Sequence, residues 1–282
     1  MKHNQREIFD AVAYKSSRIT THAYSTSFSF GIRMLDKSMR DPICAIYGMV
    51  RFADEIVDTF HDHDKERLMQ RFREDTFRAI DEGISLNPIL HSFQKTCREY
   101  RIERELVDTF LRSMEMDLER RNYDRKGFED YILGSAEVVG LMCLRVFTEN
   151  NDTLYQSLKP HAMSLGAAFQ KINFLRDLKA DYIDLGRTYF PHLDFRNFSE
   201  CDKAEIEKEI ERDFNHAYEG ILKLPRHARL GVLVAYMYYK QLFMKIRLVP
   251  SHRIMEERIR IPNQKKLALM MSCYIRNNLN LL

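Results

Sequence analysis

The sequence predicts an all-α protein, and three observations carry that prediction. Only ten glycines and seven prolines interrupt 282 residues, whereas Leu, Met, Glu, Lys and Arg, which favour helices, are abundant. Apolar residues recur at steps of three and four along most of the chain, as they do on one face of a helix. The alternation of apolar and polar residues that is typical of a β-strand is nowhere sustained.

The first clear helix is expected to begin at Asp41 and Pro42, because a capping aspartate followed by a first-turn proline is a common helix start. The segment CAIYGMVRFADEIVDTF then continues without a break. The next helix is expected over residues 64–82, with Gly83 as its C-terminal cap. Asn87 and Pro88 open another helix.

Six further helices are expected over residues 103–122, 127–148, 152–184, 199–220, 225–248 and 263–279. Residues 186–198, GRTYFPHLDFRNF, lack helical periodicity, and their aromatic side chains are expected to pack. The chain has no internal repeat, low-complexity tract or linker-like run. A single domain over residues 1–282 is therefore expected.

The charge balance and the cysteines narrow the class of protein. The 44 basic and 41 acidic residues leave a net charge of +3, which gives no reason to expect nucleic acid as a partner. The five cysteines form no CxxC pair and fit a reducing cytoplasm. The N-terminal residues contain no apolar signal core, and no apolar run is long enough to span a bilayer. The protein is expected to be soluble or peripherally attached to a membrane.

Two acidic stripes are the strongest functional signal. Tyr47, Arg51, Asp54 and Asp58 follow one another at steps of four, three and four, which places them on one face of a helix that is otherwise apolar. A polar stripe on a helix buried around most of its circumference is expected to face an internal cavity.

The second stripe consists of Gln170, Asn173, Asp177 and Asp181, with Arg176 beside Asp177, in another apolar helix. A lone DxxxD pattern is usually a solvated helix face, but a second copy in an apolar helix reverses that interpretation. Unpaired carboxylates cost several kcal/mol to bury, so cations are expected to compensate them. Magnesium is suitable, since it binds through one or two carboxylates together with phosphate and water.

The runs that carry these stripes resemble the squalene and phytoene synthases, which join two prenyl diphosphates head to head. YSTSFSFGIRMLDKSMRDPICAIYGMVRFADEIVD resembles the opening block of that family. YILGSAEVVGLM resembles its central helix, and AAFQKINFLRDLKADYIDLGRTYFP resembles its second aspartate block with the loop that follows.

The resemblance implies an isoprenoid-synthase-type helical bundle around a central cavity, with Mg²⁺, or Mn²⁺ as a substitute, bridging two aspartate motifs and a diphosphate. It implies metal ligation by Asp54, Asp58, Asn173, Asp177 and Asp181. It also implies catalytic roles for the four aspartates, for Arg51 and for Tyr131. The residues that it assigns to diphosphate binding are Ser25, Ser27, Tyr47, Arg51, Gln170, Asn173, Arg176 and Arg187. Tyr189 falls in the loop expected to close over the site.

Three positions depart from the family pattern. Ala180 stands where an acidic residue often precedes the last aspartate, and Glu55 replaces a second aspartate while keeping its charge. Glu137 stands where a small residue is usual, and nothing in the sequence explains it.

The family chemistry implies ionisation of an allylic diphosphate, a cyclopropyl diphosphate intermediate and rearrangement to a linear hydrocarbon within an apolar wall. Glycines 134, 140 and 166 on the central helices serve either the prenyl chain or close helix packing. Candidates for the wall are Phe28, Phe30, Val138, Val139, Leu141, Met142, Leu165, Phe169 and Leu233, with Tyr236 or Tyr239 as further contributors.

Phytoene synthesis from two geranylgeranyl diphosphates, without NADPH, is the preferred function. Squalene or dehydrosqualene synthesis from farnesyl diphosphate is the alternative. Chain-elongating transferases and terpene cyclases usually carry DDxxD rather than DEIVD with QxxNxxRD, and a non-catalytic assembly factor on the same scaffold would be expected to lose aspartates. Oily substrates favour peripheral contact with the inner face of the membrane, while substrate chain length and oligomeric state stay open.

His61 and His63 are interpreted as a surface loop rather than a metal site.

Overall fold

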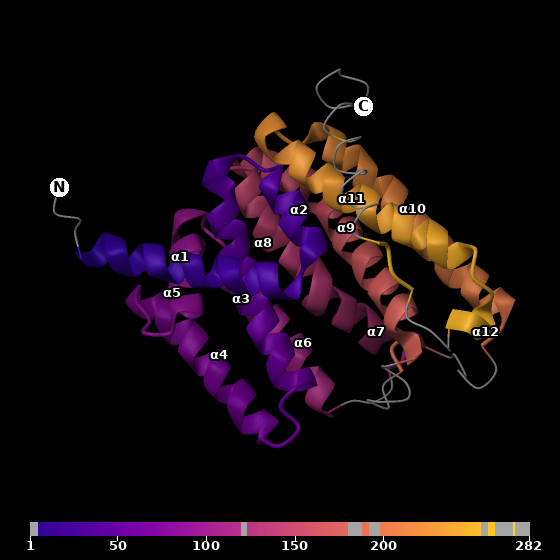
Figure 1. Cartoon of the computed structure of the whole chain (residues 1–282), viewed down its shortest axis with the longest axis horizontal. Coiled ribbons are helices and arrows are strands. Elements are labelled where there is room, and N and C mark those ends of the chain that lie inside the picture. The colour runs from indigo at the N-terminus through magenta and orange to yellow at the C-terminus, as the bar shows by residue number, and fades with distance from the viewer. Residues whose placement is uncertain are drawn as a thin grey trace.

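The computed structural model describes residues 5–119, 123–179, 188–191, 198–254, 259–262 and 273, and every regular element in these ranges is a helix (Figure 1). The all-α prediction is confirmed. In chain order the elements are α1 (Gln5–Tyr24), α2 (Thr26–Arg33), α3 (Lys37–Asp58), α4 (Lys65–Glu82), α5 (Pro88–Glu99), α6 (Arg104–Glu119), α7 (Arg125–Ile132), the π-helix η1 (Leu133–Glu137), α8 (Val138–Phe147), α9 (Asp152–Lys179), α10 (Glu200–Lys223), α11 (Arg226–Arg247) and α12 (Ser251–Ile254).

The predicted start of α3 is wrong by five residues, since the expected cap was Asp41 and the observed cap is Asp36. Asp36 is the N-cap, and its side chain accepts a hydrogen bond from the backbone N–H of Ser38 at 3.0 Å. Asp41 instead forms an ion pair with Arg18 of α1 at 2.9 Å. Pro42 is buried inside the helix, where it removes one backbone hydrogen bond without ending the element.

Other helix boundaries agree with the caps read from the sequence. Gly83 ends α4 with a left-handed backbone, φ 71°. Asn87 caps α5 by accepting from the backbone N–H of Ile89 at 3.0 Å, with Pro88 in the first turn. The helix expected over residues 263–279 lies outside the described residues except for Cys273, and nothing in the sequence analysis predicted α1 or α2.

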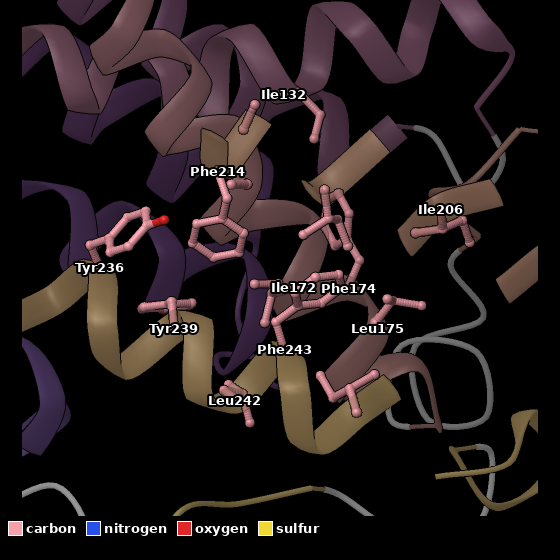
Figure 2. Close-up of a cluster of buried hydrophobic side chains, with 14 of the residues drawn as sticks. Ile132, Ile172, Phe174, Leu175, Ile206, Phe214, Tyr236, Tyr239, Leu242 and Phe243 are labelled. Carbon is pink, nitrogen blue, oxygen red and sulfur yellow. The ribbon is translucent and has the colours of Figure 1, made fainter. Parts of the chain in front are cut away.

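Two hydrophobic clusters form the core. One joins α3, α4, α5, α6 and α8, and the other joins α7, α9, α10 and α11. Figure 2 shows part of the second cluster, where the Phe214 ring of α10 lies 5.2 Å from that of Tyr236 and 5.8 Å from that of Phe243. Helix α2 packs on α11, which brings the N-terminal part of the chain against the C-terminal part.

The helix expected over residues 127–148 contains a π-helix in its middle. In η1 the backbone N–H of Val138 bonds to the carbonyl of Leu133, five residues back, so one turn is wider than an α-helical turn. A Cβ added to Gly166 of α9 would lie 2.6 Å from the carbonyl oxygen of Ala136 in this turn. Added Cβ atoms would also crowd Gly134 against α6 and Gly140 against α9, so all three glycines permit close helix packing.

No helix within the described ranges is both long enough and apolar enough to cross a bilayer.

Candidate active site

A cavity of ≈ 300 Å³ lies between α2, α3, η1, α8, α9, α10 and α11, and its lining is predominantly apolar. Of the predicted wall residues, Phe28, Val139, Leu165, Phe169 and Tyr239 line it. The other candidates do not line it: Val138, Leu141, Met142 and Leu233 belong to the helix-packing cores, and Phe30 is half-buried with Arg33 over its ring. Of the alternatives Tyr236 and Tyr239, it is Tyr239 that contributes to the wall.

The two predicted stripes begin at this cavity, whereas Asp54, Asp58 and Asp177 are not among the residues that line it. Tyr47 from α3 lines it together with Gln170 and Asn173 from α9. The Phe28 ring of α2 lies between them, 6.1 Å from the ring of Tyr47 and 6.0 Å from that of Tyr239. The Tyr239 hydroxyl donates to Asn173 Oδ1 at 3.2 Å. Side chains from four helices therefore connect the start of one stripe to the start of the other.

On α3, Arg51 holds the first aspartate. Its Nη1 donates to Asp54 Oδ2 at 2.6 Å, its Nη2 donates to Glu55, and its guanidinium lies 4.3 Å from the centre of the Tyr24 ring. Burial, followed by the negative charge of Asp58, raises the pKa of Asp54 to about 7 despite this arginine. The Asp54 side chain is 35% exposed, so solvent reaches it.

On α9, Arg176 holds the next aspartate in the same way. Its Nε donates to both carboxylate oxygens of Asp177, at 3.0 and 3.2 Å. Burial opposes the charge of Arg176, but its hydrogen bond to Asp177 and the negative charge of that carboxylate raise the pKa of the guanidinium overall. Cations do compensate Asp54 and Asp177, as expected, and in this structure they are the arginines of the protein itself. Asp181 and Arg187 lie outside the described residues, as does Ala180.

A buried carboxylate that the sequence analysis missed completes the region. Asp117 of α6 accepts hydrogen bonds from the hydroxyls of Tyr131 at 2.6 Å, Tyr123 at 3.2 Å and Tyr189 at 3.3 Å. Its charge contributes to the raised pKa of Asp54. Tyr131 is buried, and burial together with the Asp117 charge raises its pKa well above the usual value. An aspartate within an acidic, amphipathic helix gives no sequence signal of this role.

The remaining predicted residues lie at the edge of the site or away from it. Ser25 caps α2 by accepting from the backbone N–H of Phe28 at 3.1 Å, and Ser27 is half-buried on the first turn of α2. His61 and His63 are exposed beyond the end of α3, which confirms the surface interpretation. Glu137 faces a second cavity of ≈ 350 Å³ between α7, η1, α9 and α10.

The donor set suits magnesium that arrives with a phosphate ligand. Asp54, Asp58 and Asp177 offer the hard oxygen atoms that Mg²⁺ prefers, and crowding of negative charge around Asp54 is the condition that a cation relieves. Across the described ranges no three carboxylate, imidazole or thiol groups converge to form a ready-made cage. One or two carboxylates with substrate phosphate and water are the usual Mg²⁺ environment, so these residues fit that mode.

Comparison with known proteins identifies the family. The family model described as squalene/phytoene synthase matches residues 21–265. A 15-cis-phytoene synthase of Synechocystis sp. is 29% identical over 94% of this chain and 85% of its own length. A 4,4'-diapophytoene synthase of Staphylococcus haemolyticus is 28% identical over 67% of this chain and 65% of its own length.

Solved structures agree on the fold. A dehydrosqualene synthase in complex with a ligand superposes with a TM-score of 0.79 at 17% identity, covering 94% of this chain and 96% of that one. The squalene synthase HpnC from Alicyclobacillus acidocaldarius gives a TM-score of 0.74 at 18% identity, covering 85% and 95%. With an apolar cavity flanked by two aspartate-bearing helices, this chain belongs to the squalene/phytoene synthase family.

Proposed function

We propose that this protein is a magnesium-dependent phytoene synthase, which condenses two geranylgeranyl diphosphates head to head and releases diphosphate. The observation that carries the proposal is an apolar cavity of ≈ 300 Å³ that is lined by Tyr47, Gln170 and Asn173, the residues that begin the aspartate stripes of α3 and α9. Several phytoene synthases among the relatives, matched over most of this chain, support the product assignment.

In the proposed site, Asp54, Asp58, Asp177 and Asp181, with Asn173, hold the metal. When bound, magnesium supplies positive charge that stabilises the departing diphosphate. The groups that bind the phosphate oxygens are Ser25, Ser27, Tyr47, Arg51, Gln170, Arg176 and Arg187. Burial raises the pKa of Tyr47 to about 12, so its hydroxyl stays protonated and can donate a hydrogen bond.

The cavity wall protects the allylic cation, because apolar side chains exclude the water that would quench it. Phe28, Phe169 and Tyr239 contribute aromatic rings to the wall of the cavity, and the negative π-surface of such rings favours positive charge. Tyr131, in the last turn of α7 and hydrogen-bonded to Asp117, is proposed to act near the reacting carbons.

The test is extraction of the product from purified protein incubated with Mg²⁺ and geranylgeranyl diphosphate, without any reductant. Phytoene is expected, together with its loss in Asp54→Ala and Asp177→Ala and its retention in Asp62→Ala, an exposed aspartate beyond α3. Omission of Mg²⁺ is expected to abolish turnover, and Mn²⁺ to restore it.

The second candidate is squalene or dehydrosqualene synthesis from farnesyl diphosphate. The matched 4,4'-diapophytoene synthase and a presqualene diphosphate synthase of Rhodopseudomonas palustris, 30% identical over 60% of this chain, favour it. Products derived only from farnesyl diphosphate in the same assay would select this candidate and reject the first. We also infer that the enzyme works in the cytoplasm at the membrane surface, because its substrates and product are lipids.

A further inference from the structure

Both aspartates that open the proposed metal site are already bonded to arginines. Asp54 Oδ2 accepts from Arg51 Nη1 at 2.6 Å, and both oxygens of Asp177 accept from Arg176 Nε, at 3.0 and 3.2 Å. The Arg51 side chain is 29% exposed and that of Arg176 is 18% exposed, so neither pair is a loose surface contact.

The same four groups have competing roles in the proposed reaction. A metal ion competes with the guanidinium groups for Asp54 Oδ2 and for both oxygens of Asp177. A guanidinium that gives up its aspartate is stabilised by a new anion, because an unpaired buried charge is strongly unfavourable. A diphosphate supplies that anion, since guanidinium binds phosphate oxygens in pairs. Metal binding alone therefore competes with both ion pairs, and it leaves Arg51 with Glu55 as its remaining carboxylate partner.

Resting on the function proposed above, we infer that Arg51 and Arg176 are exchangeable counter-ions that keep the metal ligands closed until diphosphate arrives. Diphosphate draws the arginines away, and the released carboxylates of Asp54 and Asp177 then bind the metal. Metal and diphosphate thus favour each other's binding through the chain's own arginines, in addition to their direct contact. Free metal binds weakly, and an empty enzyme does not accumulate bound cations.

Because of Glu55, the hold of Arg51 on Asp54 depends on the shape of the arginine side chain as well as on its charge. Arg51 spans both Asp54 and Glu55 with its two terminal nitrogens. The planar fork of arginine makes this geometry possible, whereas the single ammonium of lysine does not reproduce it. Arg51→Lys therefore keeps the positive charge but loosens the hold on Asp54, while Arg51→Gln removes both.

The experiment is calorimetric titration of Mn²⁺ into the full chain, with and without saturating inorganic diphosphate. Without diphosphate, Arg51→Gln and Arg51→Lys are both expected to bind Mn²⁺ about fivefold or more tightly than the wild type, the lower range of typical site coupling. With diphosphate, both are expected to bind it more weakly than the wild type. Arg125→Gln, whose arginine pairs with Glu129 and Glu209 away from this cavity, is the matched control and is expected to change neither value.

The outcomes separate this inference from the proposed function. Tighter Mn²⁺ binding in Arg51→Gln but not in Arg51→Lys would mean that overall charge alone explains the effect, and it would overturn the exchange of counter-ions. Unchanged Mn²⁺ binding in both variants would overturn it as well. Both results leave metal and diphosphate binding by the wild type intact. A wild type that binds no Mn²⁺ even with diphosphate would overturn both ideas. If the variants fail to fold, a wild-type structure with Mn²⁺ and diphosphate decides, since a retained Arg51–Asp54 hydrogen bond would refute the exchange.

Discussion

At the scale of single residues, Asp54 shows how the site trades stability for function. Its pKa is raised to about 7, chiefly by burial and then by Asp58, so ionising Asp54 disfavours the folded state. The penalty is fully present above about pH 7 and disappears as pH falls towards the unfolded-state value of 3.8. A carboxylate whose ionisation destabilises the folded protein is better explained by a role in binding a ligand than by a role in folding.

Asp54→Asn is therefore expected to raise the free energy of unfolding at pH 8 by about 1 kcal/mol, a figure reduced for the solvent that reaches this side chain. The gain should shrink at pH 5, where Asp54 is mostly protonated in the folded protein. Urea denaturation at the two pH values measures it. Asp62→Asn is the control, because a hydrogen bond from His63 lowers the pKa of Asp62 and its removal brings no gain. A less stable Asp54→Asn at pH 8 would contradict the argument.

Tyr131 and Tyr123 provide a graded test of the Asp117 cluster. Tyr131→Phe removes a 2.6 Å hydrogen bond to a buried carboxylate and is expected to cost about 1–3 kcal/mol of stability. Tyr123→Phe removes a longer one of 3.2 Å and is expected to cost less. Denaturation curves give both values, and turnover of the prenyl substrate should fall further in Tyr131→Phe. Equal losses of stability in the two variants would contradict the prediction that the shorter hydrogen bond to Asp117 contributes more.

At the scale of helices, the sequence was informative where an element's own residues decide its ends. Gly83 and the Asn87–Pro88 pair marked the boundaries of α4 and α5 because capping is a local interaction. The sequence did not predict helix α1 because its large apolar residues do not mark its buried face. It buries the small residues Ala13, Ser17 and Thr21 and exposes Ile8 and Ile19, at 45% and 61%. Apolar periodicity finds large buried residues, and this helix has none.

The wide turn of η1 leads to a prediction about the glycines packed on it. Gly166→Ala is expected to destabilise the protein by about 1–3 kcal/mol, because the new methyl group meets a backbone carbonyl that has little freedom to move. Gly48→Ala in α3 is the matched control. Its nearest contacts are Ser17 Oγ at 3.1 Å and Ile89 Cγ2 at 3.3 Å, and the gain in helix propensity of about 1 kcal/mol offsets a small shift of those side chains. Thermal unfolding of both variants tests this; a Gly166→Ala protein as stable as Gly48→Ala would refute it.

At the scale of the whole molecule, the cavity belongs to no single element. Seven helices line it, and α9 runs along its wall from Leu158 to Asn173. Ala162 lies eight residues before Gln170 on α9, which corresponds to about 12 Å along the helix axis. Ala162 is therefore distant from the polar end of the cavity, which Gln170 marks. Packing of α2 against α11 closes the enclosure and supports our inference that residues 1–282 form one domain.

Filling the part of the cavity around Ala162 should shorten the prenyl chain that the enzyme accepts. Ala162→Phe is expected to lower turnover of geranylgeranyl diphosphate at least about tenfold more than that of farnesyl diphosphate, because the added ring occupies space needed by the longer chain. Competition between the two substrates, followed by product analysis, measures the ratio. Cys201→Phe, at an exposed position of α10, is the control and should leave the ratio unchanged. An unaltered ratio in Ala162→Phe would place the chain end elsewhere.

By itself, the sequence determined the helical class, several helix ends and the two aspartate stripes, since each depends on residues within a few turns of one another. It did not determine which groups meet. The hold of Arg51 on Asp54 lies within one stripe, but only the folded structure shows that the carboxylates are partnered. Asp117, whose partner Tyr189 is distant in the chain, became visible only through tertiary contacts. Likewise, the close approach of Gly166 to η1, a neighbour in space that no local pattern of α9 encodes, became visible only in the folded structure, where this glycine also lines the cavity.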